Sequence, residues 1–72
     1  MFNETNVQSS MLTSLGYDAG SRQVVATFKS NGDRWRYDGV PPNVYEEVIG
    51  AESIGKAFSS LIKGRYTAQK IG

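Results

Sequence analysis

The fold is decided by residues 23–38, whose sequence is QVVATFKSNGDRWRYD. The first half of this stretch is rich in β-branched and aromatic side chains, which favour a strand. Asn31 and Gly32 follow, and this pair is the strongest short-range signal for a hairpin, because a type I′ turn needs a positive φ at both central residues. We therefore predict antiparallel strands over residues 23–29 and 34–38, joined by a two-residue turn.

A two-residue turn fixes the register of the hairpin and assigns each side chain to one of two faces. It places Phe28 opposite Trp35 and Lys29 opposite Arg34, although like charges directly opposite one another are destabilising. One face is expected to be apolar and aromatic, and the other polar and largely basic. The apolar face would hold Val24, Ala26, Phe28, Trp35 and Tyr37, and the polar face Val25, Thr27, Lys29, Arg34, Arg36 and Asp38.

The segments around the hairpin predict one more strand and two helices. Residues 9–17 are compatible with a strand, and residues 18–21 form a turn signal. The pair Pro41-Pro42 suits the first turn of a helix that ends at Gly50. Ser53 can cap a second helix. The apolar stripe of that helix consists of Ile54, Phe58, Leu61 and Ile62, and it extends to Tyr66 unless Gly64 ends the helix.

Together these elements predict an α+β domain, a three-stranded antiparallel β-meander in the order β-β-β-α-α with two helices packed on one face. Residues 1–8 are expected to be a flexible N-terminal segment, residues 9–68 a single domain and residues 69–72 a short tail. No apolar run approaches the ~20 residues that span a bilayer, and a signal peptide is not evident. We therefore expect a cytoplasmic protein with no membrane partner.

The composition argues against most enzymes. Among its 72 residues the chain contains no Cys and no His. This excludes thiolate nucleophiles, zinc–thiolate sites, imidazole metal ligands and His-dependent catalytic triads. Glu46 and Glu47 are adjacent, so they point in different directions around a helix and do not form a facing acid/base pair. We therefore expect no catalytic residue, no metal, no cofactor and no enzymatic activity.

The net charge is only +1, but the basic residues are concentrated in the middle and at the C-terminal end of the chain. A basic cluster on the polar hairpin face can bind phosphates, and the second predicted helix carries a further basic group. The alternative is that these residues form ordinary solvated surfaces, with the helix lysines complementing the helix dipole. The candidate nucleic-acid-binding residues are Lys29, Arg34, Arg36, Lys56, Lys63 and Arg65.

The aromatic residues allow two interpretations. Aromatic side chains on a sheet face can stack on the bases of single-stranded nucleic acid. The same face must also meet the helices, so Trp35 and Tyr37 are alternatively part of the core or its edge. Tyr17 and Tyr66 lie near the ends of elements and are better placed to present a hydroxyl to solvent.

A series of short motifs follows in a characteristic order. They are Ser9-Ser10-Met11, Leu15-Gly16-Tyr17-Asp18, Phe28, Trp35-Arg36-Tyr37, Val40-Pro41, Val44-Tyr45 and Ser53-x-Gly55-x-x-Phe58-x-x-x-Ile62-x-x-x-Tyr66. Over residues 7–66 this order resembles the KTSC domain, a small bacterial and phage module named for its occurrence at the C-terminus of some lysyl-tRNA synthetases. Trp35 stands where that family usually has a tyrosine.

The resemblance implies an RNA-binding role only by analogy with the attached tRNA-charging enzyme. We favour a small non-enzymatic module that binds RNA through the basic sheet face. The alternative is a protein–protein interaction module, such as a phage-encoded regulator or inhibitor of a host protein, for which a free edge strand is suited. The partners that stay open are therefore RNA and a host or cellular protein.

Overall fold

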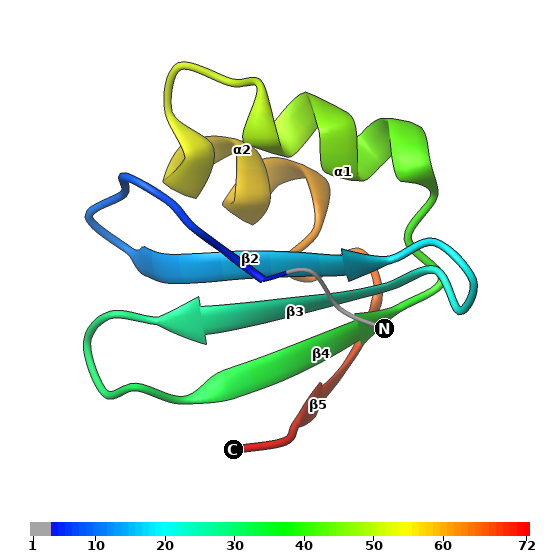
Figure 1. The fold of residues 1–72 in the computed structure, drawn as a ribbon, viewed down its shortest axis with the longest axis horizontal. Coiled ribbons are helices and arrows are strands. Elements are labelled where there is room, and N and C mark those ends of the chain that lie inside the picture. The colour runs from blue at the N-terminus through cyan, green and yellow to red at the C-terminus, as the bar shows by residue number, and fades with distance from the viewer. Residues whose placement is uncertain (1–3) are drawn as a thin grey trace.

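The computed structural model describes residues 4–72, which form one curved antiparallel sheet with two helices on one side (Figure 1). The strands lie in the order β1-β2-β3-β4-β5 across the sheet. The elements are β1 (Thr5–Asn6), β2 (Leu12–Asp18), β3 (Gln23–Phe28), β4 (Arg34–Asp38), α1 (Pro42–Ile49), α2 (Ile54–Leu61) and β5 (Thr67–Lys70). No helix within residues 4–72 has the length and apolar character needed to cross a membrane.

The α+β class and the two helices are confirmed, but the three-stranded meander is wrong, because β1 and β5 extend it at its two edges. All residues of these two strands are exposed. They therefore lack the alternation of apolar and polar side chains that identifies a half-buried strand. β1 lies within the segment expected to be flexible, and β5 crosses the boundary expected after residue 68.

The central hairpin has a register that differs by two residues from the predicted one. The observed pairs are Val24–Tyr37, Val25–Arg36, Ala26–Trp35 and Thr27–Arg34. Phe28 therefore does not face Trp35, and the predicted like-charge pair of Lys29 and Arg34 is wrong. Because the shift is even, each strand residue keeps the face predicted for it.

A longer turn causes this shift. The N–H of Phe28 donates to the carbonyl oxygen of Asp33, and the N–H of Gly32 donates to the carbonyl oxygen of Phe28, both at 2.9 Å. Gly32 has a φ of 75°, but the φ of Asn31 is not positive, because Arg22 is the only non-glycine residue in the described range with a positive φ. Asn31 therefore does not adopt the type I′ conformation. Its Oδ1 instead accepts a 3.0 Å hydrogen bond from the N–H of Asp33, an Asx-type contact.

The strand predicted over residues 9–17 begins three residues later, at Leu12. Ser9 accounts for the delay, because its Oγ accepts hydrogen bonds from the N–H groups of Met11 at 3.1 Å and Leu12 at 3.3 Å. A side chain that bonds to the backbone two and three residues ahead turns the chain and competes with strand pairing. The serine motif is thus the entry turn to β2.

Both helices begin where the sequence predicts. Pro41 precedes α1, and Gly50 follows its last residue. Ser53 Oγ accepts a 3.4 Å hydrogen bond from the N–H of Lys56 and so caps α2. This contact satisfies one of the free N–H groups in the first turn of the helix.

α2 ends at Leu61, and Gly64 then adopts a φ of 82°. A left-handed residue cannot continue a right-handed helix, and glycine tolerates this conformation because it has no Cβ. Tyr66 therefore lies beyond α2 and packs, half-buried, against the core from the connection to β5.

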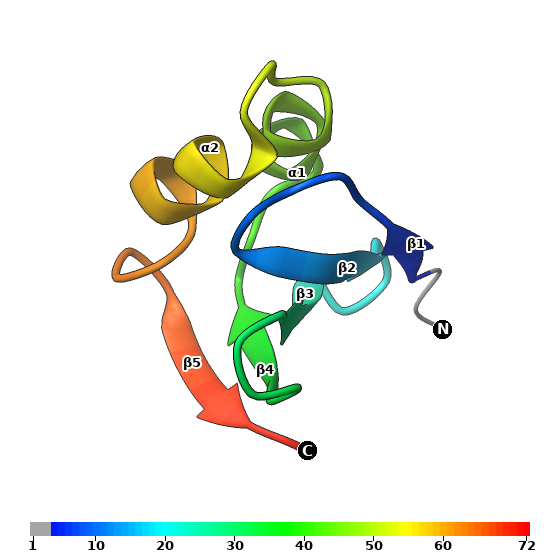
Figure 2. The same cartoon turned by 90° about the vertical axis from the view of Figure 1, so that its left-hand side faces the viewer.

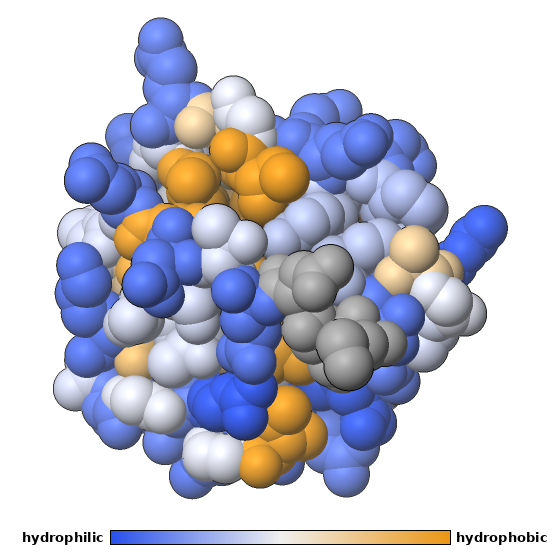
Figure 3. All heavy atoms as spheres, viewed as in Figure 1, coloured by the Kyte–Doolittle hydropathy of each residue, from blue (hydrophilic) through white to orange (hydrophobic). Residues whose placement is uncertain are grey.

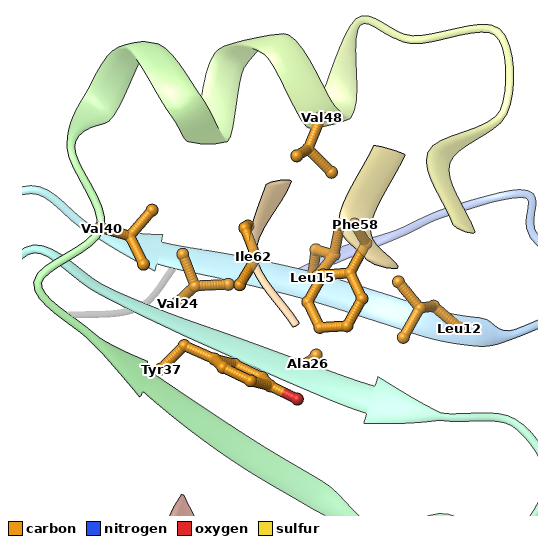
Figure 4. Close-up of a cluster of buried hydrophobic side chains, with 9 residues drawn as sticks. All are labelled: Leu12, Leu15, Val24, Ala26, Tyr37, Val40, Val48, Phe58 and Ile62. Atoms are coloured by element: carbon orange, nitrogen blue, oxygen red, sulfur yellow. The ribbon is translucent and has the colours of Figure 1, made fainter. Parts of the chain in front are cut away.

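The core lies between the sheet and the two helices (Figure 4). Phe58 and Ile62 of the predicted apolar stripe are both 0% exposed. The Phe58 ring makes edge contacts with Tyr37, at a centroid distance of 5.3 Å, and with Phe28, at 5.9 Å. The buried cluster consists of Leu12, Leu15, Val24, Ala26, Tyr37, Val40, Val48, Phe58 and Ile62.

Candidate binding groove

The arginines of the outer sheet face, the side opposite the helices, are paired within the chain. Arg34 Nη2 lies 2.7 Å from Glu4 Oε2, and Arg36 Nε lies 3.0 Å from Asp38 Oδ1. Arg36 Nη2 also donates to Gln69 Oε1 at 2.8 Å. Each guanidinium therefore has a carboxylate beside it, which lowers the positive potential that this face presents to a phosphate.

Lys29 is also bonded within the chain, and the centre of the outer face is buried. Lys29 Nζ donates a 2.8 Å hydrogen bond to the carbonyl oxygen of Ser9. Val25 is only 1% exposed although it lies on the outer face. Glu4 lies so close to the neighbouring strand that a Cβ added at Gly16 would be 2.6 Å from its Cγ. Glu4 thus covers part of the outer face.

The other three predicted basic residues are exposed and form no ion pair within residues 4–72. Lys56 lies in the first turn of α2, whereas Lys63 and Arg65 follow the last turn. Lys63 Nζ lies 5.8 Å from the centroid of the Phe28 ring, on the helix side of the sheet. The structure therefore does not unite the six candidates into one basic surface.

An open groove of about 420 Å³ lies at the end of the molecule where the β3–β4 turn approaches the chain between α2 and β5. Figure 2 looks onto this end. The volume is within the ~300–1,000 Å³ typical of small-ligand pockets. The aromatic part of its lining consists of Phe28, Trp35 and Tyr37, and the polar part includes Ser30, Asn31, Asp33 and Lys63.

The aromatic residues Trp35 and Tyr37 belong both to the core or its edge and to the groove lining. Tyr37 is 3% exposed and belongs to the core. Its hydroxyl makes no hydrogen bond within residues 4–72. Every buried side-chain oxygen in this range has a hydrogen-bond partner, so the Tyr37 hydroxyl is not buried and reaches solvent. Trp35 is half-buried, packs against the core and lines the groove. The core edge and the groove wall are therefore formed by the same aromatic side chains.

The hydroxyl of Tyr17, which was expected to face solvent, donates a 2.7 Å hydrogen bond to the carbonyl oxygen of Val40. Its ring stacks on Tyr45, with centroids 4.9 Å apart. Burial raises the pKa of Tyr17, Tyr37 and Tyr45; for Tyr17 the nearby Arg22 cation partly opposes this rise. These tyrosines are therefore kept protonated, and none is activated as a base.

A second, more polar cavity of about 510 Å³ lies beside the N-terminus of α2. The hydroxyls of Ser9 and Ser53 are used in the local hydrogen bonds described above. A Cβ added at Gly55 would lie 2.9 Å from Ser9 Oγ. The serines and the glycine are thus explained by close packing of the entry turn on α2. Within residues 4–72 no cluster of three or more acidic residues could hold a metal ion.

The comparisons with known proteins agree with this geometry. The family model described as the KTSC domain matches residues 8–66. The chain belongs to the KTSC domain family. The crystal structure of a KTSC domain protein from Yersinia pestis superposes with a TM-score of 0.94 at 33% sequence identity, and the match covers 100% of both chains.

Two bacterial relatives extend the similarity. An uncharacterised protein from Stutzerimonas stutzeri is 38% identical over 60 residues, which is 83% of each chain. A protein from Tsukamurella paurometabola is 34% identical over 62 residues, covering 86% of this chain and 91% of the relative. The KTSC resemblance inferred from the motifs is therefore confirmed.

The KTSC motifs map mainly onto packing. Ser9 forms the entry turn, Tyr17 bonds to Val40, and Gly55 allows the close approach of that turn to α2. Of the motif residues, Phe28, Trp35 and Tyr37 also line the groove. The polar groove residues Ser30, Asn31 and Asp33 were not predicted as site residues. Their position in a turn directly before an aromatic strand could have marked them as candidates. The groove could not be predicted, however, because one of its walls includes Ala68 of β5.

Proposed function

We propose that this KTSC protein is a non-enzymatic module that binds single-stranded RNA in the groove, with Lys63 and Arg65 contacting phosphates. The observation that carries the proposal is the position of Trp35, which is half-buried at the groove. The ammonium of Lys63, which forms no ion pair within residues 4–72, lies on the same rim. Stacking of a base on an aromatic ring contributes about 1–3 kcal/mol and is tolerant of sequence. We place this activity in the cytoplasm.

The groove is better suited to phosphate contacts than the outer face. Lys63 and Arg65 have no carboxylate partner in the described part of the chain, whereas Arg34 and Arg36 have one each. Binding to phosphate would require each arginine to exchange an existing partner. Two free cations support weak, salt-sensitive binding rather than high affinity.

The test uses Trp35, because it is the only tryptophan of the chain. Titration with a single-stranded uridine octamer at low salt should quench its fluorescence, and binding should weaken steeply as salt is added. Lys63→Ala combined with Arg65→Ala should reduce the affinity about tenfold and lower the salt slope by about 2. The matched control is Arg34→Ala combined with Arg36→Ala, which removes the same number of charges from the outer face.

The outcome of that control locates the site. If the double substitution of Arg34 and Arg36 removes binding and that of Lys63 and Arg65 does not, the RNA site is the basic sheet face. If no RNA binds even at low salt, a protein partner becomes the better account, with the outer edge of β5 as its docking strand. On the face drawn in Figure 3, the hydrophobic residues form separate small groups rather than one broad apolar patch.

A further inference from the structure

The groove carries two opposite charges on different segments. Lys63 belongs to the turn after α2, and Asp33 belongs to the β3–β4 turn. Asp33 is held in place by its own N–H, which donates to Asn31 Oδ1 at 3.0 Å. The lining therefore brings together a basic residue from one segment, an acidic residue from another, and aromatic side chains from the edge of the core.

The carboxylate of Asp33 keeps free acceptor capacity. Its side chain is 29% exposed, and its Oδ1 lies 3.6 Å from Lys70 Nζ. This separation is longer than the ~2.7–2.9 Å of a charge-assisted hydrogen bond, so the contact is an ion pair without a close hydrogen bond. A carboxylate can accept about four hydrogen bonds, and a ligand donor can therefore be added.

The position of Lys63 argues against a cationic ligand. Aromatic grooves with a nearby carboxylate can bind quaternary ammonium groups over the ring faces. Here the ammonium of Lys63 already lies over the Phe28 ring, 5.8 Å from its centroid. A second cation in the groove would be repelled by the Lys63 ammonium. A planar neutral ring that carries a phosphate would instead suit the aromatic rings, the Asp33 carboxylate and the Lys63 ammonium.

We propose that the groove selects guanine, with the Asp33 carboxylate accepting from N1–H and the N2 amino group while the base stacks beside Trp35. This inference rests on the proposed RNA-binding function. Guanine is the only common RNA base whose Watson–Crick edge presents two adjacent donors. Adenine and cytosine place a ring nitrogen acceptor beside their single amino group, and uracil flanks its single N–H with two carbonyl oxygens, so each would direct a lone pair at the carboxylate.

The test compares three RNA octamers that are uridine except at one central position, which is guanine, inosine or adenine. Inosine keeps N1–H and lacks only the N2 amino group. Trp35 fluorescence should show the guanine octamer binding about tenfold more tightly than the adenine octamer, with the inosine octamer between them. Asp33→Asn should abolish this order, so that the three octamers bind to the variant with equal affinity. Lys70→Ala is the matched control, because it removes the 3.6 Å contact and retains the carboxylate.

The outcomes separate the two proposals. If all three octamers quench Trp35 with equal affinity, or if Asp33→Asn keeps the order, guanine selection is overturned and RNA binding stands. If no octamer binds, both proposals are overturned. An amide proton spectrum of Asp33→Asn that matches the wild type outside the groove establishes that a lost preference reflects the carboxylate and not a changed fold.

Discussion

The hydroxyl of Tyr17 donates a 2.7 Å hydrogen bond to the carbonyl oxygen of Val40, 23 residues further along the chain. The bond joins β2 to the segment that leads into α1, so it fastens the sheet to the helical layer. Tyr17→Phe should therefore lower the free energy of unfolding by about 1 kcal/mol, because the carbonyl loses its partner. Urea denaturation measures this change.

Tyr45→Phe is the control for that substitution. Tyr45 is the stacking partner of Tyr17, and its hydroxyl makes no hydrogen bond within residues 4–72. Its replacement keeps the ring stack and should change the free energy of unfolding by less than ~0.5 kcal/mol. Equal losses for the two variants would mean that the bond to Val40 adds nothing to stability.

Gly55 should be sensitive to any side chain. A Cβ there would lie 2.9 Å from Ser9 Oγ, which is itself held by the N–H groups of Met11 and Leu12. Gly55→Ala should destabilise the fold by about 1–3 kcal/mol, although alanine is the better helix former. Thermal unfolding of both single variants and of the double variant with Ser9→Ala measures the coupling. The double variant should lose less stability than the two single variants together, because Ser9→Ala removes the clashing oxygen. Strictly additive losses would contradict the clash.

The raised pKa of Tyr37 should make stability fall at alkaline pH. Burial raises the pKa of Tyr37 above its ordinary value of 10.0 in the folded protein. Above pH 10 the unfolded chain loses this proton while the folded chain keeps it, so the free energy of unfolding decreases as pH rises toward the folded pKa. Below pH 10 the contribution is fully present.

Tyr37→Phe tests this dependence, because it removes the titrating hydroxyl and keeps the ring in the core. The free energy of unfolding, measured in urea between pH 8 and pH 11, should decline less steeply in the variant than in the wild type. All other side chains are common to both proteins, so their contributions cancel in the difference. Parallel curves would rule out the role assigned to Tyr37.

Gly64 should tolerate asparagine better than alanine. Its φ of 82° is left-handed, and a Cβ added there meets nothing within 4 Å, so the cost is purely one of backbone conformation. Gly64→Ala should destabilise by about 1–2 kcal/mol, and Gly64→Asn by less. Gly20→Ala is the control, since its added Cβ would only reach ordinary contact with Asp18 Oδ1 at 3.4 Å. A chemical denaturation series in which all three variants match the wild type would contradict the strain.

The sequence alone was enough for the elements whose signals are local. Ser53, Pro41 and Gly50 marked the helix ends correctly, because a cap or a stop depends on the few residues around it. The even shift left every hairpin side chain on its predicted face, so the core side of β3 and β4 followed from alternation alone. The order of the KTSC motifs identified the family.

Tertiary structure alone decided the rest. The hairpin register depended on Asn31 bonding to the N–H of Asp33 rather than adopting a positive φ, and a dipeptide rule does not distinguish these two states. β1 and β5 carry exposed polar residues, so only their long-range backbone pairing reveals them. The pairing of Arg34 with Glu4 and the meeting of Asp33 and Lys63 at one groove join residues about 30 positions apart. Such encounters are set by how the layers pack, which no local pattern records.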